Sequence, residues 1–249
     1  AVPKARDWQA VARAGTSTAI GRALPRSVDR LPDAVAVATL PPGTSRGDVL
    51  LVPFGVASRG LAPALLTMRA GDHVLVTGPA RSGKTTTLRT LARQIEAWRI
   101  ARVVNLGGRH QPHADVATLR SLTEPLLETD ERVVVLVDDA DVFDDGGTLM
   151  PLLLPGRPGL HVVAAGRGDR LRGLFRHWTT EVRRSRLGIL LRGDELDGDL
   201  VGARVPRRSP APWRPGRGWL VTDDAVELCQ VALADAVTEA TEEDTDRCA

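Results

Sequence analysis

The chain has 249 residues, of which 43% are hydrophobic, and this composition allows one core of ordinary domain size and excludes disorder throughout. No apolar run reaches the roughly 20 residues that a membrane helix needs, and the first residues lack the pattern of a signal peptide, so we expect neither feature. The two cysteines, Cys229 and Cys248, lack the spacing of a metal site, which favours a reduced, cytoplasmic compartment.

Charge is spread unevenly along the chain although the formal net charge is only +2. Residues 166–218 carry thirteen arginines against six acids, whereas residues 222–249 carry nine acids against one arginine. Such asymmetry suggests a nucleic-acid partner. However, the basic residues are dispersed and aromatic residues that could stack on bases make up only 3% of the chain, which favours a solvated surface.

In chain order, residues 1–48 contain many helix and strand breakers and are expected to be a linker or N-terminal arm. Hydrophobic periodicity then predicts alternating elements over residues 49–237, which we expect to form one domain. The expected strands are 49–54, 61–68, 73–77, 101–106, 133–137, 161–165, 187–191 and 218–221, and the expected helices are 84–98, 115–127, 169–180 and 223–237. Apolar strands separated by helices predict an α/β fold with a mainly parallel sheet and helices on both faces. The acidic residues 238–249 are expected to be disordered.

A glycine-rich segment connects the strand at 73–77 to the helix at 84–98, and it matches G-x-x-x-x-G-K-[ST]. The segment is Gly78, Pro79, Ala80, Arg81, Ser82, Gly83, Lys84 and Thr85, followed by Thr86. Its two glycines let backbone N–H groups point inward at the start of a helix, where they cradle an anion. We therefore predict that this loop binds ATP, with Lys84 on the β- and γ-phosphates, Thr85 on Mg²⁺ and Thr86 on the α-phosphate.

The strand at 133–137 ends in Asp138 and Asp139, about fifty residues after the glycine-rich loop. Mg²⁺ needs a carboxylate at the end of a neighbouring strand, and Asp138 is predicted to hold the metal through water. Asp139 stands where many such ATPases carry a glutamate that activates the attacking water. Asp139 could also be an ordinary solvent-exposed acid at the end of a strand.

Three other groups of residues carry charged or polar side chains that could belong to a site. Arg167, within Gly166-Arg167-Gly168, lacks the context of a dinucleotide loop and is predicted either to sense the γ-phosphate or to be a surface arginine. One of Arg183, Arg184 and Arg186 could reach a nucleotide on a neighbouring subunit. His110 and His113 have a metal-compatible separation, but we interpret them as surface residues.

Several segments together resemble the FtsK/SpoIIIE superfamily, over about Leu31 to Val231. They are Leu51-Val52-Pro53-Phe54-Gly55-Val56, Leu61-Ala62-Pro63, His73-Val74-Leu75-Val76-Thr77-Gly78, Asp138-Asp139, Ala164-Ala165-Gly166-Arg167, Arg183-Arg184-Ser185-Arg186-Leu187-Gly188, Asp197-Gly198-Asp199-Leu200 and Pro215-Gly216-Arg217-Gly218. The resemblance is strongest to the C-terminal ATPase modules of the EccC/EssC proteins of type VII secretion. It implies a RecA-like P-loop NTPase that binds ATP and Mg²⁺.

The resemblance also implies partners and a location. Such modules lie in tandem within longer, membrane-anchored chains, so this chain is expected to be a soluble cytoplasmic part with neighbouring ATPase modules. The expected substrate is a small helical secreted protein recognised through its C-terminal signal, and a hexamer is a candidate assembly. Asp139 is one methylene shorter than glutamate, so we expect weak ATP hydrolysis.

Two alternatives stay open: a DNA translocase and a nucleotide-binding structural module with little catalysis. An FtsK-like DNA translocase carries a further DNA-reading domain, and the tail after about Asp235 is too short and acidic to supply one. DNA is therefore not expected as a partner.

Overall fold

The computed structural model describes residues 30–108, 132–154, 158–223 and 225–234. Within these residues, ten strands form one sheet with the order β1-β2-β10-β9-β8-β4-β7-β6-β5, and β3 pairs with β2 outside this path. The strands are β1 (Thr44–Arg46), β2 (Val49–Ala57), β3 (Pro63–Met68), β4 (Val74–Thr77), β5 (Arg102–Gly107), β6 (Val133–Asp138), β7 (Leu160–Gly166), β8 (Leu187–Leu191), β9 (Arg217–Val221) and β10 (Val226–Val231).

The sheet has a parallel half and an antiparallel half. Strands β8, β4, β7, β6 and β5 run parallel to one another. From β8 onward the pairs with β9, β10, β2, β1 and β3 are antiparallel. Four of these strands, β4, β6, β7 and β8, are buried almost throughout, because helices cover both of their faces. β4 lies between β7 and β8 in the centre, so whatever follows β4 emerges at the middle of one sheet edge.

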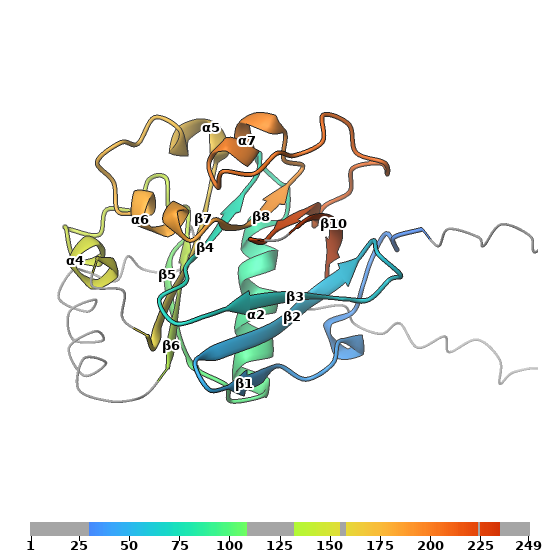
Figure 1. Cartoon of the computed structure of the whole chain (residues 1–249), viewed down its shortest axis with the longest axis horizontal. Helices are drawn as coiled ribbons and strands as arrows, with labels where there is room; N and C mark the ends of the chain where they lie inside the picture. Colours follow the sequence, from blue (N-terminus) through green and yellow to red (C-terminus); the bar gives the residue numbers. More distant parts are fainter. Residues whose placement is uncertain (1–29, 109–131, 155–157, 224, 235–249) are drawn as a thin grey trace, which may run out of the picture.

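The helices are η1 (Val37–Thr39), α2 (Lys84–Ala97), α4 (Leu149–Leu153), α5 (Gly168–Leu171), α6 (Thr179–Arg184) and α7 (Glu195–Asp199). α2 buries Leu88, Leu91 and Ile95 in a hydrophobic cluster on one face of the sheet. The cluster on the other face contains side chains of α4 and α6, among them Leu152 and Val182. Figure 1 shows α2 near the middle of the molecule, with α4 and α6 on the side of β5 and β6. The α/β fold with helices on both faces is thus confirmed. In the described residues, no helix combines the length and apolar character needed to cross a bilayer.

Most expected elements are present with small shifts at their ends. The helix expected at 223–237 is wrong, because residues 226–231 form β10, which pairs with β2 and β9. This stretch satisfies its backbone hydrogen bonds in a gap between two strands, which outweighs its weak helical pattern. The helix expected at 169–180 is replaced by the short α5 and α6, separated by a segment that contains Gly173.

Part of the expected N-terminal arm belongs to the fold. Residues 44–46 form β1, and Val35, Val37 and Leu40 pack with Ala232 in a small buried cluster. The structured region therefore starts before the predicted domain boundary at residue 49. The helix expected at 115–127, His110, His113, Cys248 and the acidic tail lie outside the described residues.

Candidate functional site

The glycine-rich loop leaves the carboxyl end of β4 and enters α2 at Lys84. At Gly78 a Cβ would lie 2.6 Å from the carbonyl oxygen of Leu191, and at Gly83 a Cβ would lie 2.9 Å from the backbone nitrogen of Gly216. Gly83 also has a φ of 107°, which other residues rarely adopt. Close backbone neighbours therefore require both glycines, and they allow the loop to curl over the start of α2.

The start of α2 presents polar groups that lack partners among the described residues. Its first backbone bond runs from the N–H of Thr87 to the carbonyl of Gly83 at 2.8 Å, and Gly83 provides no side-chain cap. The preceding N–H groups of the first turn therefore need acceptors from outside the helix. The buried hydroxyl of Ser82 also has no hydrogen-bond partner among the described residues. A loop with inward donors at the positive end of a 14-residue helix fits an anion such as a phosphate.

Lys84 spans the loop. Its Nζ donates to the carbonyl oxygens of Gly78 and Pro79, both at 3.0 Å. Burial lowers the pKa of Lys84, and the charges of three nearby carboxylates, Asp138, Asp139 and Asp141, oppose that shift. The amine is thus held beside the loop's carbonyls and close to the acids that follow β6.

Thr85 and Asp138 are 53 residues apart in the chain and meet at the carboxyl edge of the sheet. The Thr85 hydroxyl donates to Oδ2 of Asp138 at 2.7 Å, while Oδ1 accepts the backbone N–H of Asp139 at 3.0 Å. A hydroxyl and a carboxylate are hard oxygen ligands of the kind Mg²⁺ takes together with phosphate oxygens and water. The residues present therefore fit a magnesium-bound nucleotide.

Asp139 and Arg167 are arranged differently. Asp139 has a φ of 50°, and its half-buried carboxylate makes no hydrogen bond or ion pair among the described residues. The Arg167 guanidinium pairs with Asp169 through contacts of 2.6 and 3.1 Å, which raises the pKa of Arg167. The backbone N–H of Arg167 donates to Oδ1 of Asp141 at 2.9 Å. The charges of both residues act on Lys84, so both lie near it, but among the described residues no hydrogen bond or ion pair joins either side chain to the loop.

The three arginines considered for a neighbouring subunit lie at the opposite edge of the sheet. They precede β8, which runs parallel to β4, so they are at the amino edge of these strands. Arg183 donates to the carbonyl of Leu171, and Arg184 pairs with Glu181 at 2.8 Å. None of them is brought together with the glycine-rich loop of the same chain.

Two contributors were missed by the sequence analysis. Asp141 has a nearly buried carboxylate that holds the backbone of Arg167 and pairs with Arg170 at 3.4 Å. Gly216 donates its backbone N–H to the carbonyl of Ser82 at 2.8 Å and so touches the loop directly. In the sequence, the segment Pro215-Gly216-Arg217-Gly218 was notable only for its family resemblance. Its contact with Ser82 joins backbone atoms of residues more than 130 positions apart, so no local sequence pattern indicates it.

Comparisons with known proteins support the fold. No family model matches the chain, and no curated protein matches it. The cytoplasmic domain of EssC superposes with a TM-score of 0.68 at 17% identity, over 90% of this chain and 52% of that one. EccC of Thermomonospora curvata (ATPases 2 and 3), solved in complex with a signal sequence peptide, gives 0.61 at 20% identity, over 84% of this chain and 45% of that one. The cytoplasmic domain of the Thermomonospora curvata type VII secretion ATPase EccC gives 0.59 at 21% identity, over 84% and 29%.

The chain has the fold of these ATPase domains. These three structural neighbours are EssC and EccC proteins, as the sequence resemblance indicated, and the expected RecA-like architecture is confirmed. The chain spans about half of the first two structures and less than a third of the last.

Proposed function

We propose that this chain is an ATP-binding module of a type VII secretion motor and binds Mg-ATP through residues 78–86. The observation that carries the proposal is the 2.7 Å contact between Thr85 and Asp138 beside the glycine-rich loop. It places a hydroxyl and a carboxylate next to a cluster of unsatisfied donors and a lysine, which is the set of groups that a metal-bound triphosphate requires. The shared fold with EssC and EccC supports the motor as the setting.

Each residue has a defined role in this proposal. The backbone N–H groups of the loop, which Pro79 lacks, would surround the phosphates, and Lys84, now bonded to the carbonyls of Gly78 and Pro79, would bind the β- and γ-phosphates. Thr85 and Asp138, which are hydrogen-bonded to each other here, would hold Mg²⁺, Thr85 through its hydroxyl and Asp138 through water. Bound Mg²⁺ would supply further positive charge, because Lys84, the one lysine of the loop, cannot balance the charge of a triphosphate alone.

Hydrolysis is proposed to be weak. A residue that orients the attacking water must lie within about 2.6–3.2 Å of it, and Asp139 offers a carboxylate one methylene shorter than glutamate. Arg167, the nearest candidate for a γ-phosphate sensor, is paired with Asp169. Asp138 can serve the metal without either of them, so binding and turnover are separable.

The partners are proposed from the neighbours. One EccC structure contains ATPases 2 and 3 with a signal sequence peptide, so we propose that the longer protein of this module contains neighbouring ATPase modules and recognises a secreted protein through its C-terminal signal. A cytoplasmic location beneath a membrane anchor and a hexameric assembly belong to the same proposal.

A fluorescent ATP analogue titrated into the purified chain tests nucleotide binding. We expect binding that unlabelled ATP displaces and that EDTA weakens, because Thr85 and Asp138 act through Mg²⁺. No displacement by ATP would refute the site. A signal peptide titrated with and without ATP then tests the secretion role. If the peptide binds in neither condition, the result would argue for a module that only binds nucleotide.

A further inference from the structure

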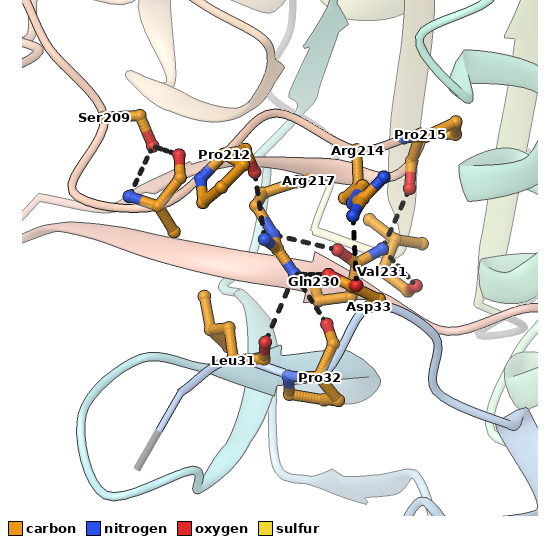
Figure 2. Close-up of polar contacts among 11 residues, drawn as sticks. Leu31, Pro32, Asp33, Ser209, Pro212, Arg214, Pro215, Arg217, Gln230 and Val231 are labelled. Atoms are coloured by element: carbon orange, nitrogen blue, oxygen red, sulfur yellow. Dashed lines mark hydrogen bonds and ion pairs between the residues drawn. The ribbon is translucent and has the colours of Figure 1, made fainter. Parts of the chain in front are cut away.

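A buried arginine lies close to the glycine-rich loop and is not used by the proposed chemistry. Arg217, at the start of β9, has only 2% of its surface exposed. Its guanidinium donates to the carbonyls of Pro212 at 2.9 Å and Pro32 at 2.7 Å, and it pairs with Asp33 at 3.3 Å (Figure 2). A buried charge is costly unless hydrogen-bonded on all sides, so this side chain is held in one orientation.

Arg217 orients Gln230 on the neighbouring strand. The two residues are paired in the register of β9 and β10, and Nε of Arg217 donates to Oε1 of Gln230 at 3.1 Å. The amide nitrogen of Gln230 must then point the other way, where it donates to the carbonyl of Pro215 at 2.9 Å. Figure 2 shows this chain of contacts running from the segment at Pro32 through Arg217 and Gln230 to Pro215.

Pro215 and Gly216 form a turn that is fixed on both sides. The carbonyl of Gly216 accepts the N–H of Val231 at 2.8 Å, and the N–H of Gly216 donates to the carbonyl of Ser82 at 2.8 Å. Gly216 has a φ of 77°, and a Cβ there would lie 3.0 Å from the amide nitrogen of Gln230. The turn is thus clamped between β10 and the last peptide of the glycine-rich loop.

The clamped peptide is the one that joins Ser82 to Gly83. In a planar trans peptide the C=O and the following N–H point in opposite directions. Because the Ser82 carbonyl points toward Gly216, the Gly83 N–H points away from Gly216 and is free for the phosphate that is proposed to bind in the loop. Without this contact the peptide could rotate and turn a carbonyl oxygen toward the anion.

We propose that Arg217 and Gln230 are positioning residues that hold the Gly83 N–H toward the nucleotide phosphates through the turn at Pro215 and Gly216. This inference rests on the proposed nucleotide site. It also makes the segment around Pro32 part of the support for that site, since two of its carbonyls, those of Leu31 and Pro32, anchor Arg217.

The test compares Gln230→Leu with Thr90→Val by titration with a fluorescent ATP analogue and Mg²⁺. Thr90 provides a matched control, because its buried hydroxyl donates to the carbonyl of Ala232 at 2.6 Å and so joins α2 to the chain just after β10 without touching the turn. We expect Gln230→Leu to weaken binding about two- to tenfold, the effect of one lost hydrogen bond. Thr90→Val should lower stability but leave affinity within about twofold, which is below one such bond. Equal affinity in Gln230→Leu and wild type, or an equal loss in both variants, would overturn the inference.

A second measurement uses the wild-type chain and does not depend on any variant folding. Amide exchange and ¹⁵N shifts should show a slowly exchanging Gly216 N–H both without and with Mg-ATP, and a Gly83 N–H whose shift changes on ATP addition. Loss of Gly216 protection on ATP binding would contradict the clamp. If ATP does not bind the wild type, the nucleotide site itself fails, whereas binding with an unaffected Gln230→Leu refutes the positioning role alone.

Discussion

β4 begins beside two buried histidines and ends at the glycine-rich loop, so the amino and carboxyl edges of the same parallel strands can be compared. At the amino edge most of the polar groups around these histidines are hydrogen-bonded, although Nε2 of His161 has no partner among the described residues. His73 accepts the N–H of Val162 at 3.1 Å and donates its backbone N–H to Ser185 at 2.8 Å, while His161 contacts the carbonyl of Asp72 at 2.9 Å. Burial lowers the pKa of both histidines, to about 4 for His73.

At the carboxyl edge the polar groups are incompletely satisfied. The N–H groups at the start of α2 and the Ser82 hydroxyl lack partners among the described residues, and the carboxylate of Asp139 makes no bond there. The difference teaches that the polar groups at the amino edge mainly stabilise the fold, whereas several at the carboxyl edge are available for a ligand. Changes at the carboxyl edge should therefore affect ligand binding, and changes at the amino edge should affect stability.

The largest effect on ligand binding is expected at Lys84. Lys84→Ala removes a charge-assisted contact worth about 1.5–3 kcal/mol, so ATP affinity should fall at least about tenfold. The fold should remain, because the glycine cradle and the buried face of α2 are unchanged. Titration with a fluorescent ATP analogue measures the loss, and thermal unfolding checks the fold. If ATP affinity is unchanged in Lys84→Ala, the carboxyl edge of the sheet is not the ligand-binding edge and the proposed difference between the two edges is wrong.

The next effect is a loss of stability in acid, and it comes from the amino edge. The pKa of His73 is about 4 in the folded chain and about 6.5 when unfolded, so the unfolded state takes up a proton first as the pH falls. From pH 7 to pH 5 this should cost about 2 kcal/mol of unfolding free energy. Urea unfolding at the two pH values measures it.

The variant His73→Asn supplies the control for that measurement. Its amide oxygen takes the place of Nδ1 of His73 and can still accept the N–H of Val162, but the side chain does not titrate. The stability difference between pH 7 and pH 5 should shrink in this variant, and an identical difference would assign the acid sensitivity to other groups.

A smaller effect is expected on turnover at the carboxyl edge. If reach limits Asp139, Asp139→Glu should raise the single-turnover rate roughly tenfold with little change in ATP affinity, because a displacement of about 1 Å can cost about a hundredfold. Asp139→Asn should change neither quantity much. Quench-flow measurement decides this, and a fast wild-type rate that is lost in Asp139→Asn would show that aspartate is competent here.

The smallest effect is expected for DNA. At least seven of the thirteen arginines in residues 166–218 pair with a carboxylate; they are Arg167, Arg170, Arg172, Arg184, Arg207, Arg214 and Arg217. We therefore expect weak binding to duplex DNA that disappears as salt approaches physiological concentration. A gel-shift series in salt checks this, and tight binding at physiological salt would support a translocase.

Many single elements were predictable because they depend on local patterns. The apolar run of β6 and the helical spacing of Leu88, Leu91 and Ile95 predicted the correct elements. Burial of one helix face, or of a whole strand, requires a hydrophobic pattern in residues close together in the chain. β10 was not predictable in this way. Its residues alternate weakly, and only the open backbone positions of β2 and β9 make an extended conformation favourable.

The sequence by itself determined that a glycine-rich loop joins a buried strand to a helix and that an acid pair follows another buried strand. Those features need only neighbouring residues, because loop curvature and helix start are local. Only the tertiary structure decided that Thr85 meets Asp138, that Arg167 is held by Asp169, and that Gly216 bonds to Ser82. The contacts of Thr85 and Ser82 depend on the order of strands in the sheet, which brings together segments 53 or more residues apart and is set by the packing of the whole core. The sequence is compatible with an Arg167 side chain that points toward the loop. In the structure it pairs with Asp169, because α5 begins directly after β7 and places Asp169 beside it.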